Sequence, residues 1–474
     1  MSDEVNPTKV RARERVLLNI ASRRARRFGA LTVLGGFCWL VLLLARDHSR
    51  AHGHIGGRLE WSITLTVVVM LLARGINLGR PVTVAHAATA AVLLLSGLSV
   101  HLVSFRFIAD MLVIAAGAAL MWPMASRPDP AALPRIWELI CHSRGDPLAP
   151  FAMQSSKSYH FNVQGTAALA YRARLGFAVI SGDPVGRHTE FTDLVADFAA
   201  MCHARGWRII VLCCSENRLS LWRDAAVLGE SLKAVPIGRD VVVDVQRFTM
   251  TGRHYRNLRQ AVGRTHNRGI TTQLIAEQDV DDELAAELAD VLYASHRGAR
   301  LERGFSMILD AAVEGRYPGV LLMIARDRLG RVDGFHRYLL AGGGSDVSLD
   351  VPWRRPGAPN GIDERLTVDM IMWSKTQGTQ RLSLAFAAFP ELFDNENRSA
   401  IDTFYYHVIT LGSPLIKLES LYRYLRKFHA LGRRRYVLLS VRHIPAALVI
   451  LLSLEFQPRR RMLARPPRRH DRAP

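Results

Sequence analysis

Apolar residues are concentrated near the start of this chain, and this concentration restricts the folds that are open to it. The apolar stretches cover about residues 29–45, 59–79, 82–103 and 106–125. A helix needs about 20 mostly apolar residues to cross a bilayer, and the first, third and fourth stretches approach that length. The second has a shorter apolar centre between Glu60 and Arg74, but an even number of crossings fits the charges around it. We therefore expect an α-helical membrane domain with about four transmembrane helices.

Basic residues predict the orientation of these helices. Residues 1–28 form a basic N-terminus, the turn from Arg74 to Arg80 is basic, and the chain continues inside after Arg127. Loops rich in Lys and Arg stay on the cytoplasmic side of a membrane. This pattern predicts a multi-pass protein of the inner (cytoplasmic) membrane, with its soluble domain in the cytoplasm.

The overall charge indicates the kind of partner, and the cysteines indicate the redox environment of the protein. A formal net charge of +20 favours a polyanion, either nucleic acid or anionic lipid. The five cysteines include the vicinal pair Cys213–Cys214 but no Cys-x-x-Cys spacing. We therefore expect reduced, buried thiols in a cytosolic domain and no metal site.

The remaining chain divides by composition. Residues 126–150 contain several prolines and are expected to be a linker, and Leu219–Val227 is expected to be a helix. We expect two subdomains in the soluble part, at residues 151–250 and 251–440. An apolar helix and a basic tail are expected to follow at residues 441–474. The apolar run Ile444–Leu454 is too short to span a bilayer, so it is either a packed helix or an interfacial one.

The stretch from Tyr317 to Phe389 carries the clearest pattern. Val320–Ile324 is a short continuous apolar run, and Leu382, Leu384 and Phe386 alternate with other residues, as strands do. Between them, Leu366, Met370 and Trp373 fall at helical spacing before Gly378. A loop rich in Pro, Asn and Gly therefore places Asp363 and Glu364 at the start of a helix.

Five motifs in order resemble the C-terminal catalytic domain of bacterial aminoacyl-phosphatidylglycerol synthases, the phosphatidylglycerol lysyltransferase family. Together they cover roughly residues 150–440. The motifs are Ser181–Gly186, Arg256–Arg259, Glu302–Ser306, Pro359–Glu364 with its helix and following strand, and Lys427-Phe428 followed by Arg435-Tyr436. The resemblance implies an α/β domain made of two N-acetyltransferase-like subdomains.

The resemblance also implies a reaction: transfer of an aminoacyl group from aminoacyl-tRNA to a glycerol hydroxyl of phosphatidylglycerol or a related lipid. The expected partners are aminoacyl-tRNA and an anionic phospholipid membrane. Because the donor is already an activated ester, no metal, nucleotide or other cofactor is expected. The site needs cations for phosphates and an anion for the aminoacyl ammonium group.

Candidate site residues follow from the matched motifs and from their charges. Glu364 stands where the family places its acid and is the first candidate, although a plain helix-terminal acid would fit the same place. Asp350, at the end of a central strand, is expected to face the same region. The expected catalytic residues are Glu364, Asp350, Lys427 and Arg435; the expected substrate-binding residues are Asp363, Arg433, Tyr436, Arg253, Arg256 and Arg259.

Other residues and other functions stay open at this point. Asp183 is better read as a turn residue than as a catalyst, and His336 as a packed core histidine than as a base. Ala430–Gly432 depart from the family pattern of Pro and Trp. The alternatives are a non-catalytic membrane protein that binds lipid or a partner, a peptidoglycan-bridge aminoacyltransferase, and an acyl-CoA-dependent acyltransferase. The acidic Pro359–Glu364 loop suits pyrophosphate poorly.

Overall fold

The computed structural model describes residues 16–18, 23–48, 55–103, 105–295, 301–303, 305, 308–388, 390 and 418–458. The chain before residue 16, Gly304 and Ser306 of the Glu302–Ser306 motif, and the basic tail after residue 458 lie outside the described residues. The chain forms two compact units. The first contains residues 1–126, 173–178 and 197–209; the second contains residues 127–172, 179–196 and 210–474.

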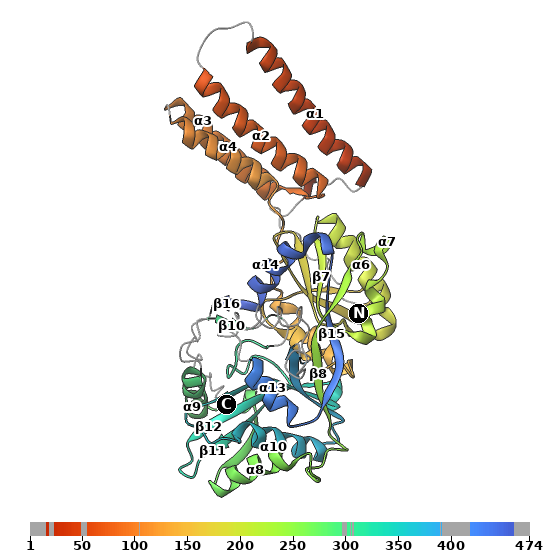
Figure 1. The fold of residues 1–474 in the computed structure, drawn as a ribbon, viewed down its shortest axis with the longest axis vertical. Helices are drawn as coiled ribbons and strands as arrows, with labels where there is room; N and C mark the ends of the chain where they lie inside the picture. The colour runs from red at the N-terminus through yellow and green to blue at the C-terminus, as the bar shows by residue number, and fades with distance from the viewer. Residues whose placement is uncertain are drawn as a thin grey trace, which may run out of the picture. The chain divides into compact units, whose positions relative to one another are not determined.

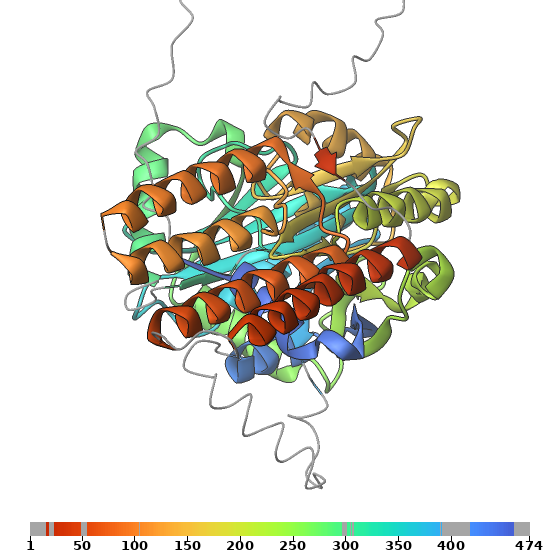
Figure 2. The same cartoon turned by 90° about the horizontal axis from the view of Figure 1, so that it is seen from above.

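The N-terminal part of the first unit consists of helices that run side by side (Figures 1 and 2). These are α1 (Arg23–His48), α2 (Ile55–Asn77), α3 (Val84–Leu102) and α4 (Arg106–Leu120). Within the described residues, α3 alone is both long and apolar enough to span a membrane. Only 11% of its apolar stretch is buried inside the protein. The number of crossings therefore stays a prediction, and α3 is the segment that supports it best.

A twelve-stranded sheet forms the centre of the α/β region, with main strand order β3-β4-β5-β7-β15-β8-β14-β13-β12-β11-β9 and β6 paired to β4. Neighbours along this order are antiparallel at most steps, but β13 and β14 are parallel. The strands are β3 (Ser158–Phe161), β4 (Ala167–Arg174), β5 (Phe177–Ser181), β6 (Val185–Gly186), β7 (Arg208–Ser215), β8 (Lys233–Asp244), β9 (Thr271–Ala276), β11 (Val320–Arg326), β12 (Val332–Ala341), β13 (Asp346–Arg354), β14 (Arg381–Ala388) and β15 (Leu431–Leu439).

The C-terminal strand β15 joins the two halves of this sheet. It lies between β7 and β8 and pairs with both of them in antiparallel fashion. Strand β8 in turn pairs with β14 of the later half. The expected subdomain boundary at residue 250 therefore does not coincide with a break in the sheet, because β15 returns from the end of the chain into the earlier half.

Helices complete the α/β region. They are α5 (Leu133–His142), α6 (Phe191–Ala204), α7 (Ala225–Leu228), α8 (Arg256–Asn267), α9 (Asp282–Ser295), α10 (Ile362–Thr376), α13 (Leu418–Arg426) and α14 (Ile444–Glu455). Short strands pair outside the main sheet: β1 (Val16–Leu18) with β2 (Val82–Thr83), and β10 (Leu301–Arg303) with β16 (Phe456–Pro458).

Two local predictions were wrong. The proline-rich segment 126–150 is not a plain linker, because α5 buries Ile136, Leu139 and Ile140. Pro134 lies in the first turn of α5, where a proline is tolerated since the first amides of a helix need no intrahelical acceptor. The expected helix Leu219–Val227 is instead a 3-10 segment followed by the short α7, which Asp224 caps with its carboxylate.

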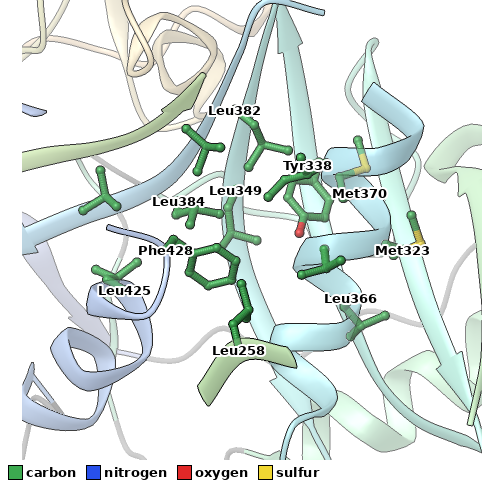
Figure 3. Close-up of a cluster of buried hydrophobic side chains, with 14 of the residues drawn as sticks. Leu258, Met323, Tyr338, Leu349, Leu366, Met370, Leu382, Leu384, Leu425 and Phe428 are labelled. Atoms are coloured by element: carbon green, nitrogen blue, oxygen red, sulfur yellow. The ribbon is translucent and has the colours of Figure 1, made fainter. Parts of the chain in front are cut away.

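The predicted strands and helix of the stretch from Tyr317 to Phe389 are confirmed as β11, β12, β13, α10 and β14. Helices α8, α10 and α13 contribute buried side chains to one core cluster with these strands, including Leu258, Leu366, Tyr338 and Phe428 (Figure 3). The opposite side of β12 packs into another cluster through Phe335, next to residues of α9. Both faces of the central strands are therefore covered, and α10 is held firmly against the sheet.

Gly361 determines how the Pro-Asn-Gly loop enters α10. Its φ of 104° lies in the left-handed region, and a methyl group on it would lie 2.4 Å from the carbonyl oxygen of Ala261 in α8. Only glycine satisfies both conditions at low cost. The loop therefore brings α8 and α10 into close contact just before Asp363 and Glu364.

We predict that Gly361→Ala lowers the melting temperature of the purified chain more than Gly357→Ala does. Both positions have positive φ, but a methyl group at Gly357 would meet no atom within 4 Å. Backbone strain alone costs about 1–3 kcal/mol, and Gly361→Ala adds a clash that separates α8 from α10. Thermal unfolding of both variants measures the difference. An equal decrease in melting temperature for the two variants would contradict the close contact of α8 with this loop.

Candidate functional site

The first turn of α10 carries two carboxylates, as the sequence predicts. Glu364 is buried, and its Oε1 accepts a hydrogen bond from Nζ of Lys427, directly after α13. The side chain of Glu364 is 8% exposed, whereas that of Lys427 is 35% exposed. The pair thus has its anion inside the domain and its cation at the surface. The predicted meeting of Glu364 with Lys427 is what the structure shows.

Asp363 lies beside this pair and contacts two other groups. Its Oδ1 lies 3.3 Å from Nε2 of His336 in β12, and its Oδ2 lies 3.4 Å from Nη1 of Arg354 at the end of β13. Burial alone would raise the pKa of Asp363, but His336, Arg354 and Lys427 together hold that pKa below its ordinary value. Asp363 is therefore an anion at neutral pH.

Buried hydroxyl groups continue from His336 into the core. The hydroxyl of Tyr338 lies 3.1 Å from Nδ1 of His336, and Oγ1 of Thr367 lies 3.5 Å from the same nitrogen. Thr367 also shares a hydrogen bond with the hydroxyl of Tyr424 in α13. Burial raises the pKa of both Tyr338 and Tyr424, so both phenols stay neutral. The resulting chain of polar contacts runs from Arg354 at the surface to Tyr424.

This network fixes the position of the α10 N-terminus. Strand β12 supplies His336 and Tyr338, α10 supplies Asp363 and Thr367, and α13 supplies Tyr424. Buried polar groups that are all hydrogen-bonded hold their elements in one arrangement, since an unpaired member would cost about 1–3 kcal/mol. His336 is fully buried, which agrees with the expected packed histidine.

Asp350 does not face Glu364, contrary to the sequence-based expectation. Its Oδ2 lies 3.1 Å from Nη1 of Arg337, and its Oδ1 accepts the Leu309 amide at 3.0 Å. Arg337 also donates to Glu277 at 2.9 Å. Consecutive side chains of a strand point to opposite faces, so Arg337 and Asp350 lie across β12 from the side chain of His336. Asp350 belongs to a buried ionic cluster on that other face.

Arg435 is likewise placed away from Glu364. It is 1% exposed and contacts the carboxylates of Asp240 at 2.9 Å, Asp146 at 2.8 Å and Asp183 at 3.3 Å. Burial, together with repulsion from the carboxylate of Asp146, raises the pKa of Asp183 and raises that of Asp240 to about 6, although Arg435 acts in the opposite direction. Arg435 joins the Asp183 turn to β8 and β15, so it is not open to a phosphate group.

The other predicted cations and Tyr436 occupy two surfaces. On β15, Arg433 is exposed and the hydroxyl of Tyr436 lies 3.5 Å from Oε1 of Glu216. Near α8, Arg253 and Arg256 are exposed. Arg259 instead donates through Nη1 to the carbonyl oxygens of Met250 and Gly252 at 2.5 and 2.7 Å. It therefore fastens the loop before α8.

Sequence reasoning missed Arg354, Thr367 and Tyr424 as parts of the site. A usable signal existed for Tyr424, since Tyr424 and Lys427 are three residues apart near the end of an amphipathic helix and such positions share a helix face. Among the described residues, no group of His, Cys, Asp and Glu has the arrangement of a metal site.

Comparison with known proteins identifies the family. The family described as "Phosphatidylglycerol lysyltransferase, C-terminal" matches residues 137–439. This chain belongs to that family. The predicted resemblance is thereby confirmed, and the match includes every strand from β3 to β15 together with the α10 site.

Similar proteins and structures agree with this assignment. The MprF-like domain protein Rv1619 of Mycobacterium tuberculosis is 58% identical over 96% of this chain and 94% of its own length. The lysylphosphatidylglycerol biosynthesis bifunctional protein LysX of Rhodococcus jostii is 31% identical over 60% of this chain, which spans about a quarter of that relative (25%).

Solved structures show the same fold for the α/β region. The structure of L-PGS from Bacillus licheniformis matches with a TM-score of 0.60 and 20% identity, covering 70% of this chain and 98% of that one. A C-terminal DUF2156 domain from Agrobacterium fabrum matches with a TM-score of 0.58, also at 20% identity, covering 69% of this chain and 98% of that one. The α/β part of the predicted fold is thereby supported.

We predict that Asp350→Asn changes the pH dependence of stability. Burial raises the pKa of Asp350 to about 7, above its ordinary value of 3.8. The folded state therefore holds the proton of the Asp350 carboxyl group more tightly than the unfolded state does. As a result, the contribution of Asp350 to the free energy of unfolding falls as pH rises from about 4 to about 7. Asp350→Asn should remove that fall. The melting temperature at several pH values, relative to the unchanged chain, measures it.

Asp244→Asn provides the control, because the Asp244 side chain is 55% exposed beside Arg247. This variant should keep the pH dependence of the unchanged chain. If Asp350→Asn gave the same profile as Asp244→Asn between pH 4 and pH 7, the raised pKa of Asp350 in the folded state would be contradicted.

Proposed function

We propose that this protein is a membrane-bound aminoacyltransferase that moves an amino acid from aminoacyl-tRNA to phosphatidylglycerol or a related anionic lipid. The observation that carries the proposal is the family match over the whole α/β region, together with the Glu364–Lys427 pair within it. The relatives named for lysylphosphatidylglycerol biosynthesis support the lipid as acceptor. The exposed apolar surface of α3 supports attachment to the membrane.

The chemistry needs few groups from the protein. The lipid hydroxyl attacks the carbonyl carbon of the aminoacyl ester and loses its proton, and the ester bond to the ribose oxygen of the tRNA breaks as that oxygen gains a proton. The protein has to hold both substrates in line and stabilise the charge that develops on the carbonyl oxygen. A carboxylate can bind the ammonium group of the amino acid, and a cation can bind a phosphate or the developing oxyanion.

Glu364 and Lys427 are proposed to supply these two charges. In the structure they neutralise each other, which avoids an unpaired carboxylate inside the domain. An incoming ammonium group can replace the lysine at Glu364, because Lys427 has a flexible stem and is partly exposed. Lys427 is then free to contact phosphate or the attacked carbonyl group. The arrangement thus exchanges one ion pair for another when substrate binds.

Asp363 and His336 are proposed to position the site rather than to react. His336 has no exposed surface, so it does not contact substrate in this arrangement. The bond from His336 to Asp363 and the contact of Asp363 with Arg354 hold the first turn of α10 in place. Asp350 and Arg435 are left out of the proposed catalytic set, because their side chains are occupied in separate buried clusters.

A basic surface near α8 is proposed to guide the tRNA. Exposed arginines gather on and next to this helix, which contains no acidic residue. Because α8 touches the entry to α10 at Gly361, the surface is next to the helix that carries Glu364. Arginine contacts phosphate through a planar fork, which suits a nucleic-acid backbone. The arginines are Arg253, Arg256, Arg264 and Arg268.

The proposed function is tested with the purified full-length chain in phosphatidylglycerol vesicles. Charged tRNA carrying labelled amino acids is added, and lipids are examined by mass spectrometry. We expect aminoacylated lipid that disappears after RNase treatment and declines steeply with salt, because phosphate binding releases counterions. Product formed from free amino acid and ATP, or acylated product formed from acyl-CoA, would contradict the proposal in favour of another enzyme class. No modified lipid with any charged tRNA would favour a lipid-binding protein.

We predict that Glu364→Gln lowers turnover by on the order of 100-fold, as the loss of one well-placed charged or polar group does in other active sites. The substitution keeps the shape of the side chain and removes the charge that holds the ammonium group. Transfer to lipid and the melting temperature are measured together. Glu287→Gln is the matched control, since Glu287 pairs with Arg326 at the surface and lies in α9.

A double variant separates catalysis from structure. If Glu364 and Lys427 served only as an ion pair, either single substitution would lower the melting temperature, and Glu364→Gln with Lys427→Met would restore part of it. The proposal requires low turnover in all three variants, including the double variant in which the melting temperature is restored. Recovery of turnover together with the melting temperature in the double variant would contradict it. Normal turnover in Glu364→Gln would return this residue to the role of a helix-terminal acid.

A further inference from the structure

Helix α14 has one buried side and one exposed side, although nearly all of its residues are apolar. Ala447, Ile450 and Leu454 are buried, with relative exposures of 1%, 2% and 4%. On the other side, Leu448, Val449 and Leu452 are exposed by 52%, 62% and 49%. Ile444 and the preceding Val441 extend this exposed side toward the start of the helix. We call these five exposed residues the α14 apolar face.

The α14 apolar face is continuous. Val441, Ile444, Leu448 and Leu452 follow one another at intervals of three and four residues, the spacing at which helical side chains become neighbours. Single exposed apolar residues are common on soluble proteins, but a continuous row marks a surface that contacts another apolar phase. Water is therefore an unfavourable environment for this side of α14.

The length of α14 limits what can cover this face. The helix has 12 residues. At about 1.5 Å per residue, such a helix is well short of the roughly 30 Å hydrocarbon core of a bilayer. It cannot cross the membrane. Its apolar face is therefore covered either by acyl chains at the surface of a bilayer or by another protein.

Charges around α14 favour the bilayer surface. Arg442 is exposed at the start of the helix, and the sequence beyond it, from Arg459 to Arg472, is rich in arginine. Cations that flank an apolar helix face are attracted to anionic lipid headgroups while the apolar side chains enter the boundary of the acyl chains. Two copies meeting through this face would instead bring like charges together.

We propose that α14 lies in the surface of an anionic bilayer, parallel to its plane, with the α14 apolar face among the upper acyl chains. The helix follows β15 directly in the chain and belongs to the second unit, seen in blue in Figure 1. It therefore attaches the α/β region itself to the lipid. This attachment does not depend on which group is transferred, so its test and the test of the proposed reaction fail independently.

Fluorescence of a single label tests the proposal in the full-length chain. Cys38 and Cys141 are first replaced by Ser, which leaves the buried Cys202, Cys213 and Cys214. An environment-sensitive fluorophore is then attached through Val449→Cys, and the chain is placed in phosphatidylglycerol vesicles that contain a spin-labelled phospholipid. The matched control is Leu329→Cys, at a position that is 92% exposed in the turn between β11 and β12.

We expect the label at position 449 to shift to shorter wavelengths and to be quenched several-fold more than the label at position 329. Leu452→Asp in the same chain should reduce that quenching, because a charge on the α14 apolar face opposes its burial in lipid. Vesicles of phosphatidylcholine alone should quench less than phosphatidylglycerol vesicles.

Three results would overturn the proposal. Equal quenching at positions 449 and 329 would show that lipid does not reach α14. A shift to shorter wavelengths at 449 without quenching by the spin-labelled lipid would show that protein covers the face. Equal quenching in both kinds of vesicle would remove the preference for anionic lipid.

Discussion

Pairing of buried charges organises the α/β region. An ionised group that leaves water is stable only when a partner of opposite charge and further hydrogen bonds replace its hydration. Arg337 meets this requirement through Glu277 and Asp350, and Arg435 through Asp146, Asp183 and Asp240. Each arginine thereby holds together segments that are far apart in sequence. Removing either arginine would leave its buried carboxylates without a cation, so these clusters favour one arrangement of strands.

The Glu364–Lys427 pair obeys the same rule but differs in one respect. Arg337 and Arg435 are enclosed with their carboxylates, whereas Lys427 retains contact with solvent over about a third of its side chain (35%). A pair whose cation can move into solvent can be opened at a lower cost than one whose two members are both enclosed. This asymmetry distinguishes the Glu364–Lys427 pair, which is open to solvent through Lys427, from the two enclosed clusters, although all three pair carboxylates with a basic side chain.

The sequence predicted the parts of the fold that depend on local periodicity. The apolar spacing of α10 and the runs that became β11 and β14 were sufficient, because helices and strands place every third or fourth and every second residue on one face. The family motifs indicated Glu364 as the acid at the start of α10, and they indicated Lys427 as a cation of the same site. The prolines of segment 126–150 are typical of a linker, but Ile136, Leu139 and Ile140 have the spacing of a helix face and form the buried side of α5.

The rest of the site could not be read from the sequence, since it depends on which strand faces which helix. His336 and Arg337 are neighbours in the chain, yet one meets Asp363 and the other Asp350. Predicting this needs the register of β12 against β13, which shifts between His336 and Tyr338. A one-residue change in register exchanges the faces of a strand. The expectation that Asp350 faces Glu364 failed at this point.

The basic surface at α8 and the α14 apolar face, both in the second unit, differ in the chemistry that they can recognise. The surface at α8 consists of arginines with few apolar side chains between them, which suits a hydrated phosphate backbone. At α14 the exposed side is apolar, and the flanking cations come before and after the helix in the sequence, a pattern that suits a hydrated polyanion poorly. Figure 1 shows α8 and α14 at opposite ends of this unit. A nucleic acid at one and a lipid surface at the other would therefore not compete, as a transfer between two large anionic substrates requires.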